Sequence, residues 1–136
     1  MTVFLCIDDR GGMTFMKRRL SRDKIMIEDL SKEVGEGILY ISDFSEALFS
    51  DSELSVMSVS NPLASAGEDD FAFIEDIPIS NAIDRIDTLI IYKWNRKYPY
   101  DFALDIDPLN CGFSLLSSCD FKGNSHDKIT KEIYRK

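Results

Sequence analysis

Two short apolar runs with an amphipathic helix between them open the chain, and this pattern predicts a βαβ unit. Residues 3–7 are rich in β-forming side chains and stop at the Asp- and Gly-containing turn signal of residues 8–12. A helix is predicted from its N-cap at Ser21 to about Val34, and residues 38–41 form the next strand. Because crossovers of this kind are right-handed, the two strands are expected to run parallel in one sheet.

The rest of the chain predicts a mixed sheet closed by a helix. Residues 54–59, 71–74, 89–94, 102–106 and 113–118 have strand composition, and brief helices are expected at 43–49 and 79–86. Ser125 is a plausible N-cap for a last helix to Tyr134, with His126, Ile129 and Ile133 on one face. The predicted fold class is therefore α+β: an N-terminal βαβ unit joined to a mixed, largely antiparallel sheet with a C-terminal helix.

Length and composition favour a single domain over residues 1–136. The chain is 44% hydrophobic, so it can bury a core without disulfides or metals. Residues 60–70 have the Pro, Gly and small polar residues of an exposed loop, which we expect to be mobile. Cys6, Cys111 and Cys119 show no C-x-x-C spacing, and no export or membrane segment is recognisable, so we expect a cytoplasmic protein.

Acidic residues are concentrated in the middle of the chain. The formal net charge is −8, and residues 33–84 contain twelve acidic residues and no Lys or Arg. This balance disfavours a protein that grips nucleic acid phosphates and favours a basic partner. The segment is interpreted either as an ordinary solvated surface or as a binding face. The candidate partner-binding residues are Glu46, Asp51, Glu53, Glu68, Asp69, Asp70, Glu75 and Asp76.

Three carboxylates near residue 100 are candidate metal ligands. In a strand over residues 101–107, Asp101, Asp105 and Asp107 share one face, and such a cluster can hold Mg²⁺. No positioned base lies nearby in the sequence, so a solvent-facing edge that resists aggregation is the other interpretation.

His126 is the only histidine, which excludes zinc sites built on several imidazoles and catalytic histidine pairs. A Ser or Cys nucleophile could still use His126, but no G-x-S-x-G elbow or cysteine-protease signature is present, so a capping or packing role is favoured.

Two clusters contain several cations. The cluster of residues 17–19 with Arg22 could meet a phosphate or pair with the acidic segment. Residues 92–100 interleave aromatics with cations, as nucleic-acid binders and protein interfaces do, although part of this stretch reads as a core strand.

Three segments together resemble a family of small bacterial proteins of about this length: residues 7–23, the run YKWNRKYP at 92–99, and residues 125–134. In size, charge and domain type the chain also resembles the immunity proteins that accompany secreted bacterial toxins. This resemblance transfers no catalytic residues. It implies a cytoplasmic, non-enzymatic protein that neutralises a basic toxin domain, such as a nuclease, through its acidic surface.

That immunity function is the leading hypothesis, with no cofactor, no bound metal, no nucleic acid or membrane partner, and a monomeric or weakly dimeric state. The alternative is a small metal-dependent nuclease or hydrolase that uses Asp101, Asp105 and Asp107, with Lys17, Arg18 or Arg19 on a phosphate. A regulatory binding module is the third interpretation.

Overall fold

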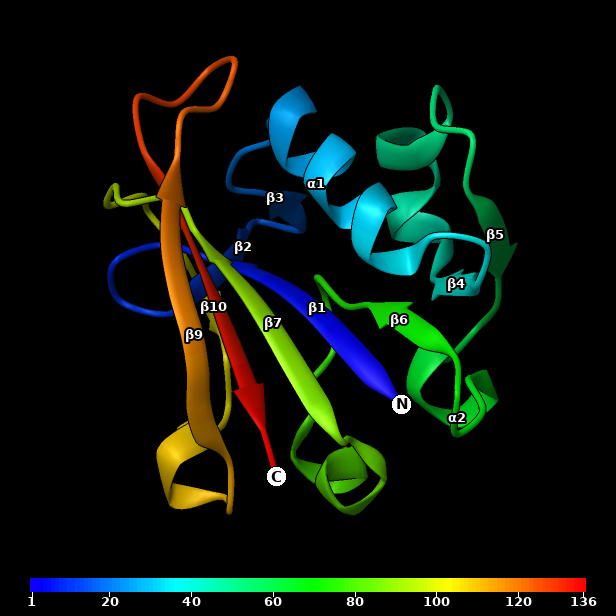
Figure 1. Cartoon of the computed structure of the whole chain (residues 1–136). Coiled ribbons are helices and arrows are strands. Elements are labelled where there is room, and N and C mark those ends of the chain that lie inside the picture. The colour runs from blue at the N-terminus through cyan, green and yellow to red at the C-terminus, as the bar shows by residue number, and fades with distance from the viewer.

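A computed structural model describes all 136 residues, and its central feature is a seven-stranded mixed sheet (Figure 1). The strand order is β5-β4-β6-β1-β7-β10-β9, in which the first five strands are parallel, β10 runs antiparallel to β7, and β9 runs antiparallel to β10. The mixed α/β architecture predicted from the sequence is confirmed, although parallel strands make up more of this sheet than expected. The strands are β1 (Thr2–Ile7), β4 (Ile38–Ile41), β5 (Ser55–Ser58), β6 (Phe71–Phe73), β7 (Thr88–Lys93), β9 (Ser114–Phe121) and β10 (Ile129–Arg135).

The predicted βαβ unit is present. It consists of β1, helix α1 (Lys24–Val34) and β4, and both strands pair in parallel with β6, which lies between them. The N-cap of α1 is Asp23 and not the expected Ser21, because the Asp23 carboxylate accepts hydrogen bonds from the second and third helical N–H groups. Gly35, with a φ of 58°, ends the helix as predicted.

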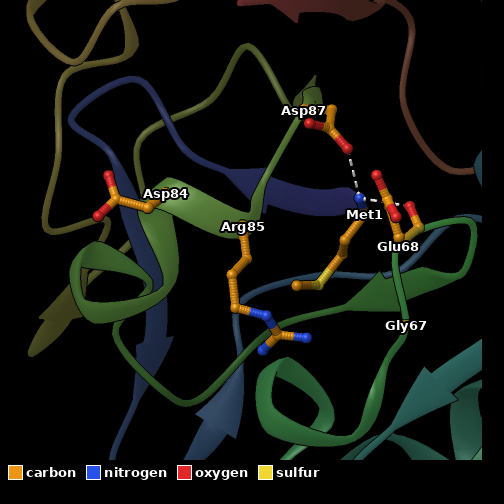
Figure 2. A pocket seen from close by; sticks show the side chains of 6 residues that line it. All are labelled: Met1, Gly67, Glu68, Asp84, Arg85 and Asp87. Atoms are coloured by element: carbon orange, nitrogen blue, oxygen red, sulfur yellow. Dashed lines mark hydrogen bonds and ion pairs between the residues drawn. The ribbon is translucent and has the colours of Figure 1, made fainter.

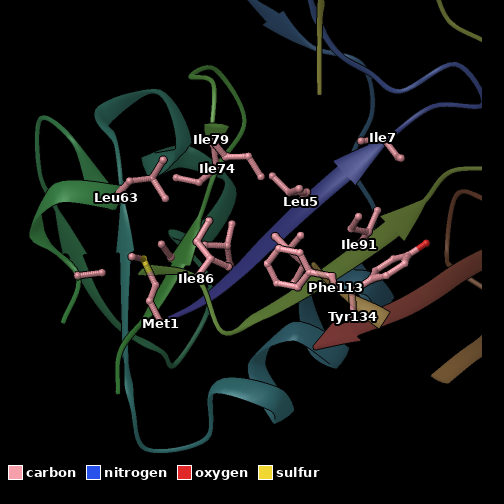
Figure 3. Close-up of a cluster of buried hydrophobic side chains, with 14 of the residues drawn as sticks. Met1, Leu5, Ile7, Leu63, Ile74, Ile79, Ile86, Ile91, Phe113 and Tyr134 are labelled. Atoms are coloured by element: carbon pink, nitrogen blue, oxygen red, sulfur yellow. The ribbon is translucent and has the colours of Figure 1, made fainter. Parts of the chain in front are cut away.

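Buried side chains cover both faces of the sheet. On one face, α1 and the 3₁₀ helix η1 (Asp43–Phe49) pack Met26, Leu30 and Phe49 against Phe4 and Phe73 of the sheet. On the other face, α2 (Pro62–Ser65) and the 3₁₀ helix η2 (Ser80–Arg85) flank a second apolar cluster. Figure 3 shows this cluster; its labelled residues are Met1, Leu5, Ile7, Leu63, Ile74, Ile79, Ile86, Ile91, Phe113 and Tyr134. Coverage on both faces is what parallel central strands require.

The predicted C-terminal helix is wrong, because residues 129–135 form strand β10. β10 lies between β7 and β9, and Ile129 and Ile133 pack on the α1 face of the sheet. Lys131 also points to that face, where its Nζ lies 2.8 Å from Asp29 and 2.7 Å from Glu33 of α1. A lysine at an inward position hides the two-residue alternation of the strand, which explains the helical interpretation.

A second, three-stranded sheet has the order β3-β2-β8. Its strands β2 (Gly12–Phe15) and β3 (Arg18–Arg19) lie between β1 and α1, where no strand was predicted. The strand expected at 102–106 is reduced to β8 (Phe102–Ala103). Leu104 N still donates to Gly11 O, but Asp105 turns away to bind the backbone near η2.

The segment 60–70 contains the short helix α2 and is otherwise without regular structure, so its mobility stays a prediction. None of the helices combines the length and apolar character needed to cross a bilayer.

Candidate active site

A buried histidine joins an aspartate and a serine at the carboxyl ends of β1 and β7. His126 Nδ1 lies 3.0 Å from Asp23 Oδ2, and His126 Nε2 lies 2.9 Å from Ser21 Oγ. Ser21 and Asp23 come from the segment between β3 and α1, whereas His126 comes from the connection between β9 and β10. In Figure 1 this connection and the start of α1 lie at the same end of the molecule. The three side chains therefore form a continuous Asp–His–Ser chain of polar contacts.

Asp23 is held from two sides. Its Oδ1 accepts from Ile25 N and Met26 N of α1, and its two oxygens also accept from Asn124 N and Ser125 N of the β9–β10 connection. Burial alone would raise the pKa of Asp23, but the hydrogen bonds from His126 and the backbone outweigh it and lower that pKa to about 2. The carboxylate is therefore ionised at neutral pH, and it fixes the orientation of the imidazole.

The His126 ring has little freedom to turn. Trp94, which directly follows β7, stacks on it with ring centroids 4.6 Å apart, and the Tyr98 hydroxyl lies 3.4 Å from Nε2. The His126 side chain is only 1% exposed, whereas Ser21 is half-buried.

Gly123 brings the β9–β10 connection close to Asp23. A Cβ at this position would clash with the Asp23 carboxylate. We therefore expect Gly123→Ala to push Asp23 away from His126 and to lower the free energy of unfolding by about 1–2 kcal/mol. Gly112→Ala is not a suitable control because its φ of 86° would itself be strained. Urea unfolding of Gly123→Ala beside exposed Asn110→Ala tests this, and equal midpoints would contradict it.

Ser21 is the side chain best placed to react. No hydrogen bond within the chain uses the backbone N–H of Ser21 or of Arg22, so both remain free to donate. A second serine, Ser125, contacts the opposite side of the ring: its Oγ lies 3.1 Å from Nδ1 and donates to Arg22 O at 2.9 Å. Ser125 thus lies on the aspartate side of the imidazole and Ser21 on the side that can accept a proton.

A second polar cluster lies between the carboxyl ends of the neighbouring strands β1 and β6. The first helix after β1 is α1 and the first helix after β6 is η2, and these two helices lie on opposite faces of the sheet. Arg19 Nε and Nη2 bind Glu75 Oε1 and Oε2 at 2.8 and 2.9 Å, and Ser45 Oγ donates to Oε2 at 2.6 Å. A position where the connections from two neighbouring strands go to opposite faces is a topological switch point, and ligands of open α/β sheets bind there. Here a bidentate ion pair, with Arg19 also over the Phe44 ring at 5.3 Å, occupies that position.

The eight acidic residues predicted to bind a partner do not form one surface. Glu75 is buried with Arg19, and it lies at the carboxyl end of β6, whereas Glu68, Asp69 and Asp70 precede the amino end of the same strand. Asp76 is exposed near the carboxyl end, and Glu46, Asp51 and Glu53 lie on or after η1. Whether any of them contacts another protein stays a prediction.

The three candidate metal ligands each bind a different part of the backbone. Asp101 accepts from Met16 N, Asp105 accepts from Ile79 N and Ser80 N, and Asp107 caps the 3₁₀ helix η3 (Pro108–Asn110). No group of three potential ligands in the structure could hold a metal ion. The metal-dependent nuclease or hydrolase hypothesis is therefore wrong, because the strand that would have aligned these residues ends at Ala103.

Hollows also open on the surface away from the two polar clusters. Figure 2 shows one of about 290 Å³, lined by Met1, Gly67, Glu68, Asp84, Arg85 and Asp87, near the amino ends of β1 and β7. In it the Met1 amino group donates to Glu68 O and Asp87 Oδ2, both at 2.7 Å. The Arg85 guanidinium, which also lines this hollow, donates to the carbonyl oxygens of Leu63 and Ala66.

The Ser21–Asp23–His126 chain was not predicted. His126 was considered as the partner of a serine nucleophile, but it was expected in a helix, and Ser21 was expected to be a helix cap. The only available signal was a Ser-x-Asp spacing before the first helix together with a single histidine. Nothing local shows that residues 103 and 105 positions apart in the sequence meet.

No family model and no curated protein sequence matches this chain. Among solved structures, its fold is similar to that of dihydrofolate reductase from Enterococcus faecalis, complexed with NADP(H) and RAB-propyl. The TM-score is 0.70 with 9% sequence identity, and the match covers 98% of this chain and 94% of that chain. At this identity the likeness shows the fold alone.

This likeness overturns the predicted immunity function. A fold shared with an enzyme over nearly the whole chain is at odds with a toxin-neutralising protein, and also with the expectation that the chain is not an enzyme. The resemblance to immunity proteins relied on size and net charge, which many unrelated small proteins share.

Proposed function

We propose that this protein is a hydrolase that cleaves an ester through Ser21. The observation that carries the proposal is the order of contacts, in which Asp23 binds His126 Nδ1 at 3.0 Å and Ser21 binds Nε2 at 2.9 Å. This is the arrangement by which serine hydrolases of unrelated folds activate a hydroxyl. The low pKa of Asp23 keeps it anionic, so it can stabilise the imidazolium that forms during the reaction.

The reaction takes place in two halves. Ser21 Oγ attacks the ester carbonyl carbon while its proton passes to His126 Nε2, and the C–O bond to the leaving alcohol breaks as Nε2 returns that proton. Water then attacks the acyl-serine and gives its proton to Nε2, which releases the acid and restores the Ser21 hydroxyl. The free N–H groups of Ser21 and Arg22 are the available donors to the oxyanion.

A dinucleotide such as the NADP(H) of the reductase structure does not fit here. In such sheets, phosphates bind at helix N-termini beyond the carboxyl ends of the strands. At the start of η2, the Ile79 and Ser80 N–H groups already bind the Asp105 carboxylate at 3.0 and 3.1 Å. The first turn of η1 carries Asp43 and Glu46, which would repel a pyrophosphate. The proposed mechanism therefore uses no dinucleotide.

A fluorophosphonate tests the proposal directly, because an activated serine displaces its fluoride and becomes phosphonylated. We expect one adduct per chain, mapped to Ser21 by peptide mass spectrometry. Ser21→Ala should abolish it, and His126→Gln should slow it about 100-fold. Ser118→Ala is the control, since Ser118 is an exposed serine of β9 away from the cluster, and this variant should label at the rate of the unmodified protein.

Three outcomes would contradict the proposal: no adduct, an adduct at another residue, or labelling that survives Ser21→Ala. Circular dichroism of each variant shows whether it has kept the native fold.

We also propose the cytoplasm as the compartment. Cys6, Cys111 and Cys119 are all free thiols, and two of them are partly buried, which suits a reducing environment.

A further inference from the structure

We propose that the ester substrate is anionic, carrying a carboxylate or phosphate group close to its scissile bond. This inference rests on the proposed function of Ser21 and adds the chemical class of the substrate. Its origin is the distribution of charge around the Ser21–Asp23–His126 chain, which is opposite in sign to that of the whole molecule.

Three connecting segments, here called loops although the first includes the short strands β2 and β3, meet at this cluster and contain most of the basic side chains. Residues 8–24, 94–100 and 122–128 together hold ten basic and four acidic residues, whereas the rest of the chain holds six basic and twenty acidic residues. Two of the four acids in these loops, Asp8 and Asp23, are buried and accept hydrogen bonds from backbone N–H groups. The exposed charge at this end of the protein is therefore positive.

Specific contacts bring these loops together around His126. Arg10 Nη2 donates to Tyr98 O at 2.7 Å, and Asp9 N donates to Arg96 O at 2.9 Å, which joins the first loop to the second. Arg96 Nη2 lies 3.4 Å from Ser125 O, next to His126 in the third loop. Arg96 therefore lies beside the third loop, as does Lys24, whose backbone N–H donates to Asn124 Oδ1 at 2.6 Å.

Most of these cations have no acidic partner within the chain. Arg10 lies 4.0 Å from the carboxylate of Asp8, and Arg19 pairs with Glu75. No acidic side chain lies within ion-pair distance of the other eight, which are Lys17, Arg18, Arg22, Lys24, Arg96, Lys97, Lys122 and Lys128. Unpaired positive side chains around a reactive group attract a negatively charged substrate and raise the rate at which it meets the protein. In a protein of net charge −8, this concentration of cations is poorly explained by solubility alone.

Arg96 and Lys24 are the side chains that we expect to determine specificity. Arg96 reaches the backbone next to His126, and Lys24 directly follows Asp23 at the start of α1. Both are exposed, so they can contact a bound anion without any rearrangement of the core.

The test compares two esters that differ by a single charge: the p-nitrophenyl monoester of adipic acid and its methyl ester. We expect kcat/KM to be about tenfold higher for the anionic ester at low ionic strength, and the preference to shrink in about 1 M salt. Arg96→Gln combined with Lys24→Gln should reduce the preference to about twofold or less. Arg135→Gln, an exposed change at the far end of β10, should not alter it.

Equal kcat/KM for the two esters, or a preference that survives the double substitution, overturns the inference about charge while the role of Ser21 stands. If neither ester is hydrolysed and the fluorophosphonate leaves Ser21 unmodified, the proposed function fails and this inference fails with it.

Discussion

Replacing Arg19 by Met is expected to lower the free energy of unfolding by about 3 kcal/mol, because it leaves the Glu75 carboxylate buried with an incomplete set of partners. Glu75 is 7% exposed, and in the native protein it binds two guanidinium nitrogens of Arg19 and the Ser45 hydroxyl. Without Arg19, one hydroxyl remains to stabilise the negative charge. Equilibrium urea unfolding at neutral pH measures the loss.

Arg18→Met is the matched control. Arg18 precedes Arg19 on the same short strand, is exposed and has no ion pair, so its replacement should change stability by less than about 0.5 kcal/mol. The double variant Arg19→Met with Glu75→Leu removes both charges and should recover most of the stability. A loss for Arg19→Met no larger than for Arg18→Met would show that this ion pair does not hold β3 against β6.

Local sequence patterns correctly predicted elements whose neighbours in the chain determine them. The apolar run of residues 3–7 and the amphipathic spacing of α1 correspond to the observed βαβ unit, and the expected short helix at 43–49 has the bounds of η1. Each of these elements buries either a regular stripe or a continuous run of apolar side chains, and this regularity is visible in the sequence.

The pattern was misleading where an inward position carries a charge. Lys131 occupies a core-facing place on β10 because Asp29 and Glu33 of α1 neutralise it, and neither partner is near it in sequence. Similarly, Asp105 leaves the expected strand to bind two N–H groups near η2. Long-range polar partners of this kind override local propensity, and no periodicity within one segment can reveal them.

The candidate site shows the same limitation. The single histidine in the sequence restricted the chemistry to mechanisms that need one imidazole. The pairing of His126 with Ser21 and Asp23 is not visible in the sequence, because the β9–β10 connection reaches α1 only through the pairing of β10 with β7. The net charge of −8 also concealed a basic end of the molecule, since only the fold separates the two signs in space.

Asp23→Asn is expected to lower the free energy of unfolding by about 2 kcal/mol at neutral pH, and the size of this loss should depend on pH. The folded-state pKa of Asp23 is lowered from the ordinary value of 3.8 to about 2. A carboxyl whose pKa is lowered on folding contributes its full stabilisation above its unfolded pKa and loses it as pH falls through the folded one. The difference between the two proteins should therefore shrink between about pH 4 and pH 2.

Urea unfolding at a series of pH values measures that difference, and Asp127→Asn is the control. Asp127 follows His126 directly but is exposed and makes no hydrogen bond, so its replacement removes the same charge without removing the network. A constant difference for Asp23→Asn down to pH 2 would mean that its charge is not what stabilises the cluster.

Because Asp23 both caps α1 and orients His126, the same substitution should also slow fluorophosphonate labelling of Ser21 under conditions where the variant remains folded. If the Asp23→Asn variant loses stability but keeps its labelling rate, Asp23 stabilises the fold and has no role in the proposed mechanism.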